Sequence, residues 1–275
     1  MAKDGVITLT ELGGLMEPET FNKISGSDSK LDPAEISRAL NAATPESRTK
    51  LAPKLREHAD YLTTTFDQID ELHREAGRKL AHWIASHYEP GKRLHITVVC
   101  TGNSRRSILG SSLGNLAAAY YGMPEIRFHS GGTAPTAFNP RTIATLKSVG
   151  FEVEQTGVEA ERGDPKTGNP IYRVSWGEGF ETKEFSKHYG DKTNPQSGFA
   201  ALMVCSEADA ACPFVKGASL RVSMPYLDPK IYDDGAYESA KYAERRDDIG
   251  RLMLSVMIQV RGAKERSHRP GAASS

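Results

Sequence analysis

Cys100 and Arg106 have the residue types and the spacing to do chemistry together. They belong to a loop that directly follows the β-branched run 94–99 and precedes the helical pattern 108–121. A loop between the C-terminal end of a strand and the N-terminus of a helix points several backbone N–H groups at one position, where the helix dipole adds partial positive charge. This placement predicts an oxyanion-binding loop. It reads Cys100-Thr101-Gly102-Asn103-Ser104-Arg105-Arg106-Ser107.

The side chains of the loop suit an anionic substrate and a sulfur nucleophile. The field that binds an oxyanion also favours a thiolate over a thiol. Arg106 can hold two oxygens with its planar fork, and Ser107 can donate a hydrogen bond to the sulfur. Gly102 allows a backbone turn closed to other residues, and Asn103 tolerates the left-handed conformation. The alternative, a core cysteine beside an exposed arginine, gives no purpose to the Gly-Asn pair or to the doubled arginine.

The loop resembles the phosphate-binding loop of the low-molecular-weight protein tyrosine phosphatases and of their relatives, the thioredoxin-coupled arsenate reductases. The turn Ser130-Gly131-Gly132-Thr133 is similar to the Ser-Ala-Gly-Thr turn that follows the second strand in that superfamily. The resemblance covers residues 94–262, interrupted at 156–198. It implies that Cys100 is the nucleophile and that Arg106 binds the oxyanion. The residues that would support the loop are Asn103, Ser107 and Ser130.

A catalytic acid is needed to protonate the oxygen that leaves. Members of the superfamily place an aspartate followed by proline late in the chain, and Asp228-Pro229 fits this pattern. Asp-Pro also forms ordinary turns, but the spacing and the motif favour catalysis. The tyrosine phosphatases usually continue with aromatic residues that flank a phosphotyrosine ring. Lys230 and Ile231 stand here instead, which weakens the aryl-phosphatase interpretation.

The other two cysteines, Cys205 and Cys212, follow the apolar run 200–204 and stand seven positions apart, with Pro213 after the second. They look like the redox region of the thioredoxin-coupled arsenate reductases. The alternative is a pair of small buried apolar residues, which is common for cysteine. Because the chain has no further cysteine, we interpret the three as one nucleophile and one exchangeable pair.

The resemblance then implies a disulfide relay that reduces arsenate to arsenite. Cys100 attacks arsenate, Asp228 protonates the departing oxygen, and Cys205 attacks the Cys100 adduct. Cys212 moves the disulfide to Cys205–Cys212, where thioredoxin reduces it. The segment 206–211 must loosen, because cysteines seven apart on a rigid helix cannot reach each other.

Two departures from the superfamily pattern concern Arg105 and Ser111. Arg105 stands where many loops of the superfamily carry a second cysteine, so that position cannot protect the nucleophile through a disulfide. Arsenate reductases of this type often carry a potassium-binding glutamate at the position of Ser111, so the sequence does not predict potassium binding.

Two other functions stay open. One is a low-molecular-weight protein tyrosine phosphatase that hydrolyses phosphate monoesters, with water attacking a phosphocysteine. The other is a non-catalytic oxyanion-binding interaction module, in which a helix before residue 90 presents a partner surface. The complete set of Cys100, Arg106 and Asp228 argues against this module.

Strands that alternate with helices predict an α/β fold, a four-stranded parallel sheet flanked by helices. The catalytic domain is expected at 94–262, with an insertion at 156–198 that holds a strand at 171–174. A helical N-terminal extension is expected at 1–90 and a disordered tail at 263–275. The expected strands are 94–99, 126–129, 151–154 and 200–204, and the expected helices are 108–121, 139–150 and 236–262.

An apolar stripe with helical spacing runs from Leu51 to His87. Pro53 and the run 63–65 can divide it into two helices. The stripe is either a coiled-coil surface for a partner or, as we favour, a face that packs on the domain that follows.

Composition bounds the remaining possibilities. The chain has 275 residues, 35 basic and 35 acidic side chains, and three cysteines. Zero net charge speaks against nucleic-acid and membrane partners, and three cysteines cannot form a disulfide framework. We therefore expect a cytoplasmic protein. The histidines show no metal-ligand spacing and no dinucleotide loop is present, so no metal or cofactor is predicted, and His129 is interpreted as structural.

Overall fold

The computed structural model describes residues 7–8, 30–31, 45–161, 168–211 and 214–267. The chain forms two compact units, Met1–Thr49 and Lys50–Ser275. In the first unit, strands β1 (Ile7–Thr8) and β2 (Lys30–Leu31) pair antiparallel, and a short helix α3 covers Glu46–Thr49.

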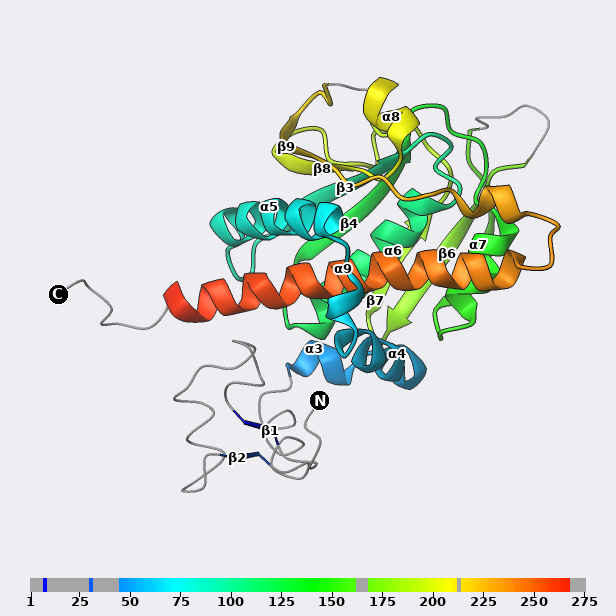
Figure 1. The fold of residues 1–275 in the computed structure, drawn as a ribbon. Coiled ribbons are helices and arrows are strands. Elements are labelled where there is room, and N and C mark those ends of the chain that lie inside the picture. Colours follow the sequence, from blue (N-terminus) through cyan, green and yellow to red (C-terminus); the bar gives the residue numbers. More distant parts are fainter. Residues whose placement is uncertain (1–6, 9–29, 32–44, 162–167, 212–213, 268–275) are drawn as a thin grey trace. The chain divides into compact units, whose positions relative to one another are not determined.

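The second unit is built on a four-stranded parallel sheet, which confirms the predicted fold class (Figure 1). The strand order is β4-β3-β8-β9, and every neighbouring pair is parallel. The two central strands, β3 and β8, are apolar and almost wholly buried, as strands covered on both faces must be. The bounds are β3 Leu94–Cys100, β4 Ile126–Gly132, β8 Phe199–Met203 and β9 Ala218–Ser223.

The parallel sheet differs from the prediction in two strands. The strand predicted at 151–154 lies in another sheet, and the edge strand β9 was not predicted. The segment predicted as a strand at 151–154 belongs to β5 (Glu152–Glu159), which forms a separate antiparallel sheet with β6 (Pro170–Gly177) and β7 (Phe180–Glu184). Only Val153 of β5 is buried, so the strand lacks the two apolar faces of a central parallel strand. The edge strand β9 contains several polar residues between its apolar ones, so the sequence shows no apolar run there. The strand expected at 171–174 is confirmed inside β6.

Helices connect and cover the sheet. Helix α6 (Arg106–Tyr120) is buried along its whole length and packs on β3 and β4. Helix α7 (Pro140–Lys147) begins as predicted, because the Asn139 side chain accepts a hydrogen bond from the Arg141 N–H and proline occupies the first turn. A short helix, α8 (Ser206–Ala211), follows β8, and the long helix α9 (Glu238–Ser267) packs against α5 and α6.

The helical stripe before the sheet packs on the domain that follows, as favoured from the sequence. It forms α4 (Pro53–Thr63), a 3₁₀ turn η1 (Phe66–Gln68) and α5 (Glu71–His87), and both helices lie against α9 (Figure 1). Asp70 caps α5 by accepting from the His73 N–H. The interface is close: a Cβ added to Gly77 of α5 would lie 2.9 Å from the Leu252 side chain of α9.

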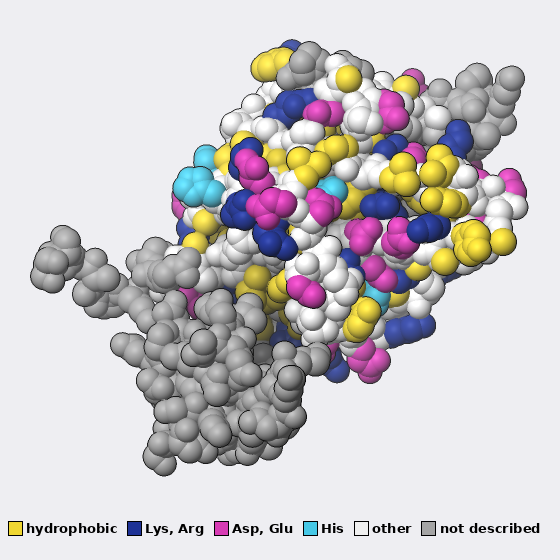
Figure 2. All heavy atoms as spheres, in the orientation of Figure 1, with side chains coloured by type: hydrophobic (Ala, Val, Ile, Leu, Met, Phe, Trp, Pro, Cys, Tyr) yellow, Lys and Arg dark blue, Asp and Glu magenta, His cyan; other side chains and the backbone are white. Residues whose placement is uncertain are grey.

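The described surface carries charges of both signs. Figure 2 shows basic and acidic side chains interspersed over the face it presents, in keeping with 35 residues of each kind in the chain. None of the helices in the described ranges is both long enough and apolar enough to cross a bilayer. The tail from residue 268 onward lies outside the described residues.

His129 on β4 provides a pH-dependent test of the packing. Its Nε2 lies 2.9 Å from Nδ1 of His95 on β3, so one ring donates and the other accepts. Burial, together with the nearby charges of His95 and Lys187, lowers the pKa of His129 from 6.5 to about 3. Between these two pH values the unfolded chain binds a proton that the folded chain does not, so stability decreases as the pH falls through this range.

We therefore expect the unfolding free energy of the unmodified protein to fall by about 2 kcal/mol more than that of His129→Gln when the pH is lowered from 7 to 5. Urea unfolding at both pH values measures this difference, and carboxylates common to both proteins cancel in the comparison. Equal pH slopes would contradict the prediction.

Candidate active site

The predicted oxyanion loop lies between β3 and α6, with Cys100 as the last residue of the strand. The Asn103 side chain donates to Ser107 Oγ at 2.8 Å, and Ser107 Oγ lies 3.1 Å from Cys100 Sγ. Because the Ser107 oxygen accepts from Asn103, its own proton is available for a hydrogen bond to the sulfur. Asn103 has φ 42°, the left-handed conformation expected of it from the sequence.

The carbonyl groups of the loop point outward, to the segment that follows β4. Thr133 donates its N–H to the carbonyl of Cys100 and Ala134 donates to that of Thr101, at 3.1 and 2.9 Å. The carbonyl of Gly102 likewise accepts from Thr136 at 3.0 Å. In a trans peptide the N–H points opposite to the C=O. The N–H groups that follow these carbonyls therefore point into the loop, where an oxyanion would be held.

Arg106 is buried, with 6% of its surface exposed. It donates to the Tyr226 carbonyl at 2.8 Å and to Asp228 Oδ2 at 2.6 Å. Its Nε has no hydrogen-bond partner within the part of the chain that the structure describes. A buried N–H without an acceptor is costly, and an oxygen of a bound oxyanion would satisfy it.

Asp228, the residue predicted as the catalytic acid, lies against the guanidinium of Arg106. One carboxylate oxygen accepts from the Lys230 N–H and caps the 3₁₀ turn η2 (Pro229–Tyr232), while the other meets Arg106. Its side chain is 30% exposed, so the carboxylate lies at the boundary between the buried arginine and solvent. Ile231, which follows in η2, is 64% exposed.

The two adjacent arginines, Arg105 and Arg106, contact different partners. Arg105 donates from Nη2 to Asp233 Oδ2 at 2.8 Å and from Nε to the Tyr242 hydroxyl at 2.6 Å. Burial raises the pKa of Tyr242 to about 12, and the hydroxyl donates to the other Asp233 oxygen at 2.7 Å. The Arg105 side chain therefore anchors the segment just after Asp228 to the loop, a role that the sequence did not indicate.

Cys205 lies beside the loop. It follows β8 directly, is fully buried, and its Sγ lies 3.4 Å from Thr101 Oγ1. The Val204 N–H donates to the Val99 carbonyl at 2.9 Å, which holds this end of β8 against the end of β3. Cys212 and Pro213, which the sequence assigned to the redox region, lie outside the described residues.

The segment predicted as an insertion also supports the loop, which sequence reasoning missed. Ser186 donates to the Gly102 carbonyl at 2.9 Å, and the Lys187 N–H donates to Asn103 Oδ1 at 2.8 Å. Ser130, expected to support the loop, donates instead to the carboxylate of Glu184 at 2.6 Å. These residues stand in a polar stretch without a motif, so no local pattern could have identified them.

The same segment requires glycine at position 131. A Cβ added to Gly131 would lie 2.5 Å from the Cα of Tyr189, which is closer than side chains and backbone approach. Even the methyl group of alanine therefore does not fit at this position.

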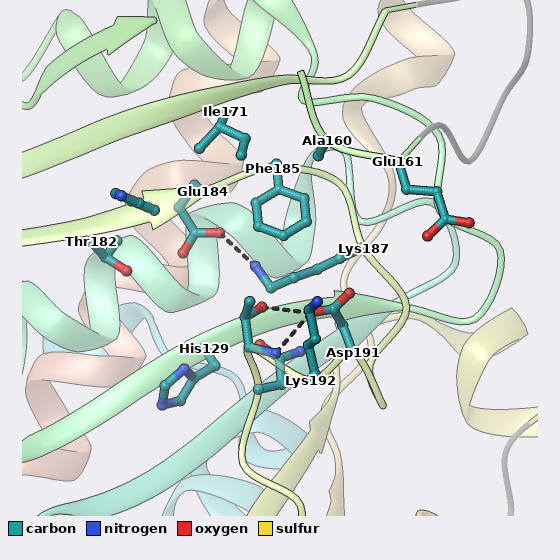
Figure 3. Close-up of a pocket in the computed structure, with 13 residues that line it drawn as sticks. His129, Ala160, Glu161, Ile171, Thr182, Glu184, Phe185, Lys187, Asp191 and Lys192 are labelled. Atoms are coloured by element: carbon teal, nitrogen blue, oxygen red, sulfur yellow. Dashed lines mark hydrogen bonds and ion pairs between the residues drawn. The ribbon is translucent and has the colours of Figure 1, made fainter. Parts of the chain in front are cut away.

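A separate pocket of about 540 Å³ lies between the insertion and β4 (Figure 3). Its lining includes His129, Glu184, Lys187 and Asp191, and none of residues 100–107. Within the described ranges, no group of three or more His, Cys, Asp or Glu side chains is arranged to hold a metal ion.

No protein-family model and no curated protein matches this chain. Solved structures do match. A low-molecular-weight protein tyrosine phosphatase from Bacillus subtilis is 14% identical, with a TM-score of 0.38, and the match covers 64% of this chain and all of the other. The tyrosine phosphatase AmsI of Erwinia amylovora is 15% identical, with a TM-score of 0.32, over 66% of this chain and 99% of the other. A thioredoxin-dependent arsenate reductase from Corynebacterium glutamicum is 14% identical, with a TM-score of 0.34, over 74% of this chain and 96% of the other.

Proposed function

We propose that this protein is a cysteine-dependent oxyanion enzyme that reduces arsenate to arsenite through a relay of three cysteines. The observation that carries the proposal is the buried Cys205 thiol, 3.4 Å from Thr101 Oγ1 in the loop that begins at Cys100. Hydrolysis needs no second sulfur beside the nucleophile, whereas disulfide exchange does.

The first step uses the loop. Arsenate would be held by the inward N–H groups and by Arg106, whose buried Nε is available to an oxygen. The Cys100 thiolate attacks arsenic, a bond forms between sulfur and arsenic, and one oxygen leaves. Asp228, in contact with Arg106, supplies the proton that lets this oxygen leave as water.

The second step transfers two electrons. The Cys205 thiolate attacks the Cys100 sulfur, a disulfide forms, and the electron pair of the sulfur–arsenic bond stays with arsenic, which leaves as arsenite. The register supports this reach: Val99 pairs with Met203, so Cys205 stands one residue beyond the position opposite Cys100. Strand spacings of about 4.8 Å across and 3.3 Å along predict a Cα separation of about 6 Å, within the range of disulfides.

The third step regenerates the nucleophile. The Cys212 thiolate attacks the Cys205 sulfur and releases Cys100, leaving a Cys205–Cys212 disulfide for reduction by thioredoxin. Residues 206–211 between them form helix α8, so the exchange requires that α8 unwind. Unwinding would expose the buried Ala208 and break the ion pair between Asp209 and Arg221.

Mapping the disulfide after one turnover tests the proposal. The reduced protein is mixed with one equivalent of arsenate without thioredoxin, quenched in acid with a thiol-blocking reagent, and digested for mass spectrometry. We expect a Cys205–Cys212 disulfide and one equivalent of arsenite. A matched sample with phosphate in place of arsenate should contain no disulfide. If arsenate also leaves all three cysteines reduced, the relay is wrong.

The alternative is a low-molecular-weight protein tyrosine phosphatase acting on phosphate monoesters. It is favoured by the direct contact of Asp228 with Arg106 of the loop that begins at Cys100, since these three residues suffice to form and hydrolyse a phosphocysteine. In the mapping experiment this function predicts no disulfide, together with steady hydrolysis of an aryl phosphate. A non-catalytic oxyanion-binding module would show neither reaction.

A further inference from the structure

A buried carboxylate from the insertion lies behind the oxyanion loop. Glu184, the last residue of β7, is 1% exposed. Its two oxygens accept from the hydroxyls of Ser111 on α6 and Ser130 on β4, at 3.1 and 2.6 Å. Lys187, also buried, places Nζ 3.6 Å from the same carboxylate, and Figure 3 shows the two side chains facing each other.

The main chain of Lys187 is linked to the nucleophile by hydrogen bonds, and Glu184 is linked to the helix that begins in the oxyanion loop. Ser111 is four residues after Ser107 on α6, about one helical turn, or roughly 6 Å, further along. The Lys187 N–H donates to Asn103, and Asn103 in turn donates to Ser107. Ser107 Oγ is the atom that lies 3.1 Å from Cys100 Sγ.

We propose that Glu184 and Lys187 are positioning residues that act as a fixed pair of opposite charges, holding the loop and setting how readily Cys100 ionises. This proposal rests on the proposed role of Cys100 as the nucleophile. It gives the insertion a function: the segment carries both charges and the main-chain donor that fixes Asn103.

The two charges should act on Cys100 with opposite signs. A carboxylate disfavours a nearby thiolate and an ammonium favours it. A unit charge roughly 10 Å from a thiol, at the effective dielectric constant of about 20 suited to protein sites, shifts the ionisation of that thiol by roughly one pH unit. In the intact pair the two effects largely cancel. A purely structural role predicts something different, since loosening the loop changes the thiol in the same direction whichever partner is removed.

Other charged groups face the pair or the thiol, and they stay constant in the comparison. Arg106 and Asp228 flank the loop. His129 lines the pocket beside Lys187 and is neutral near pH 7, because burial lowers its pKa to about 3. Asp191 and Lys192 line the same pocket. A difference between variants therefore reports the charge that was removed.

The test is the pH profile of Cys100 alkylation by iodoacetamide in the full-length chain, followed on the Cys100 peptide by mass spectrometry. Glu184→Gln should move the midpoint of the profile about one pH unit toward acid, and Lys187→Met about one unit toward alkali. The double variant should return close to the unmodified protein. Lys183→Met removes an exposed lysine of the same pocket and should leave the midpoint unchanged.

Shifts of the same sign in both single variants, or no shift in either, would overturn the proposal. Removing one member of a buried pair can prevent folding, so urea unfolding accompanies each profile. If Lys187→Met does not fold, the double variant is compared with Glu184→Gln, and its midpoint must lie on the alkaline side. Alkylation requires neither arsenate nor a phosphate ester. Opposite shifts without any turnover would therefore refute the proposed function and leave this inference standing.

Discussion

Replacing Cys205 by serine should abolish thioredoxin-dependent turnover of arsenate and leave aryl-phosphate hydrolysis largely intact. A serine hydroxyl cannot form a disulfide with Cys100, so reduction stops at the arsenic adduct. Serine keeps a polar atom near Thr101 Oγ1, which now lies 3.4 Å from the sulfur, so the loop itself should be preserved. Arsenite release and p-nitrophenyl phosphate hydrolysis, measured on the same preparation, separate the two activities.

Cys205→Ala serves as the companion variant, because a hydroxyl at this fully buried position could destabilise the chain for reasons unrelated to sulfur. Both variants should lose arsenate turnover to the same extent. Arsenate turnover that survives in either one would sink the relay and favour the phosphatase. Joint loss of both activities with normal unfolding would assign Cys205 to the oxyanion site rather than to electron transfer.

Arg106→Lys should reduce kcat/KM by roughly 10³-fold for whichever oxyanion the enzyme converts. Lysine keeps the positive charge but loses the planar fork that can donate to two oxygens at once. It also cannot reproduce the present contacts with the Tyr226 carbonyl and Asp228 while presenting a further N–H to the substrate. Steady-state kinetics with arsenate and with an aryl phosphate measure the effect.

Arg251→Lys is the matched control. Arg251 is buried to the same degree, 5% exposed against 6% for Arg106, and donates to Thr65 and Asp248 far from the loop in sequence. Its substitution should change stability without changing kcat/KM. If Arg106→Lys has no more effect on kcat/KM than this control, the oxyanion is not bound by Arg106.

Local sequence was sufficient to predict the backbone features that depend only on neighbours along the chain. A buried apolar run predicts the strand that ends at Cys100, and a helical pattern predicts α6. Asn103 is a residue type that tolerates the positive φ it adopts. The cap of α7 at Asn139 was equally readable. These features involve residues only a few positions apart, so propensity and spacing specify them.

Long-range partners could not be read in the same way. Arg105 meets Asp233 across 128 positions, and Glu184 meets Ser111 across 73. Such pairs form because the order β4-β3-β8-β9 brings separate segments to one edge of the sheet, and no local pattern encodes that order. The same limit explains why the sequence predicts residues 151–154 as a strand of the parallel sheet, whereas β5 pairs with β6.

The sequence by itself determined the loop, its cysteine and arginine, and the parallel α/β class, because each depends on residue type and short-range periodicity. Only the tertiary structure decided that Cys205 lies against the loop and that Arg105 turns away from it. It also decided that the insertion supplies a buried Glu184–Lys187 pair. Burial gives these contacts their strength, and burial is a property of the packed chain that no single segment possesses.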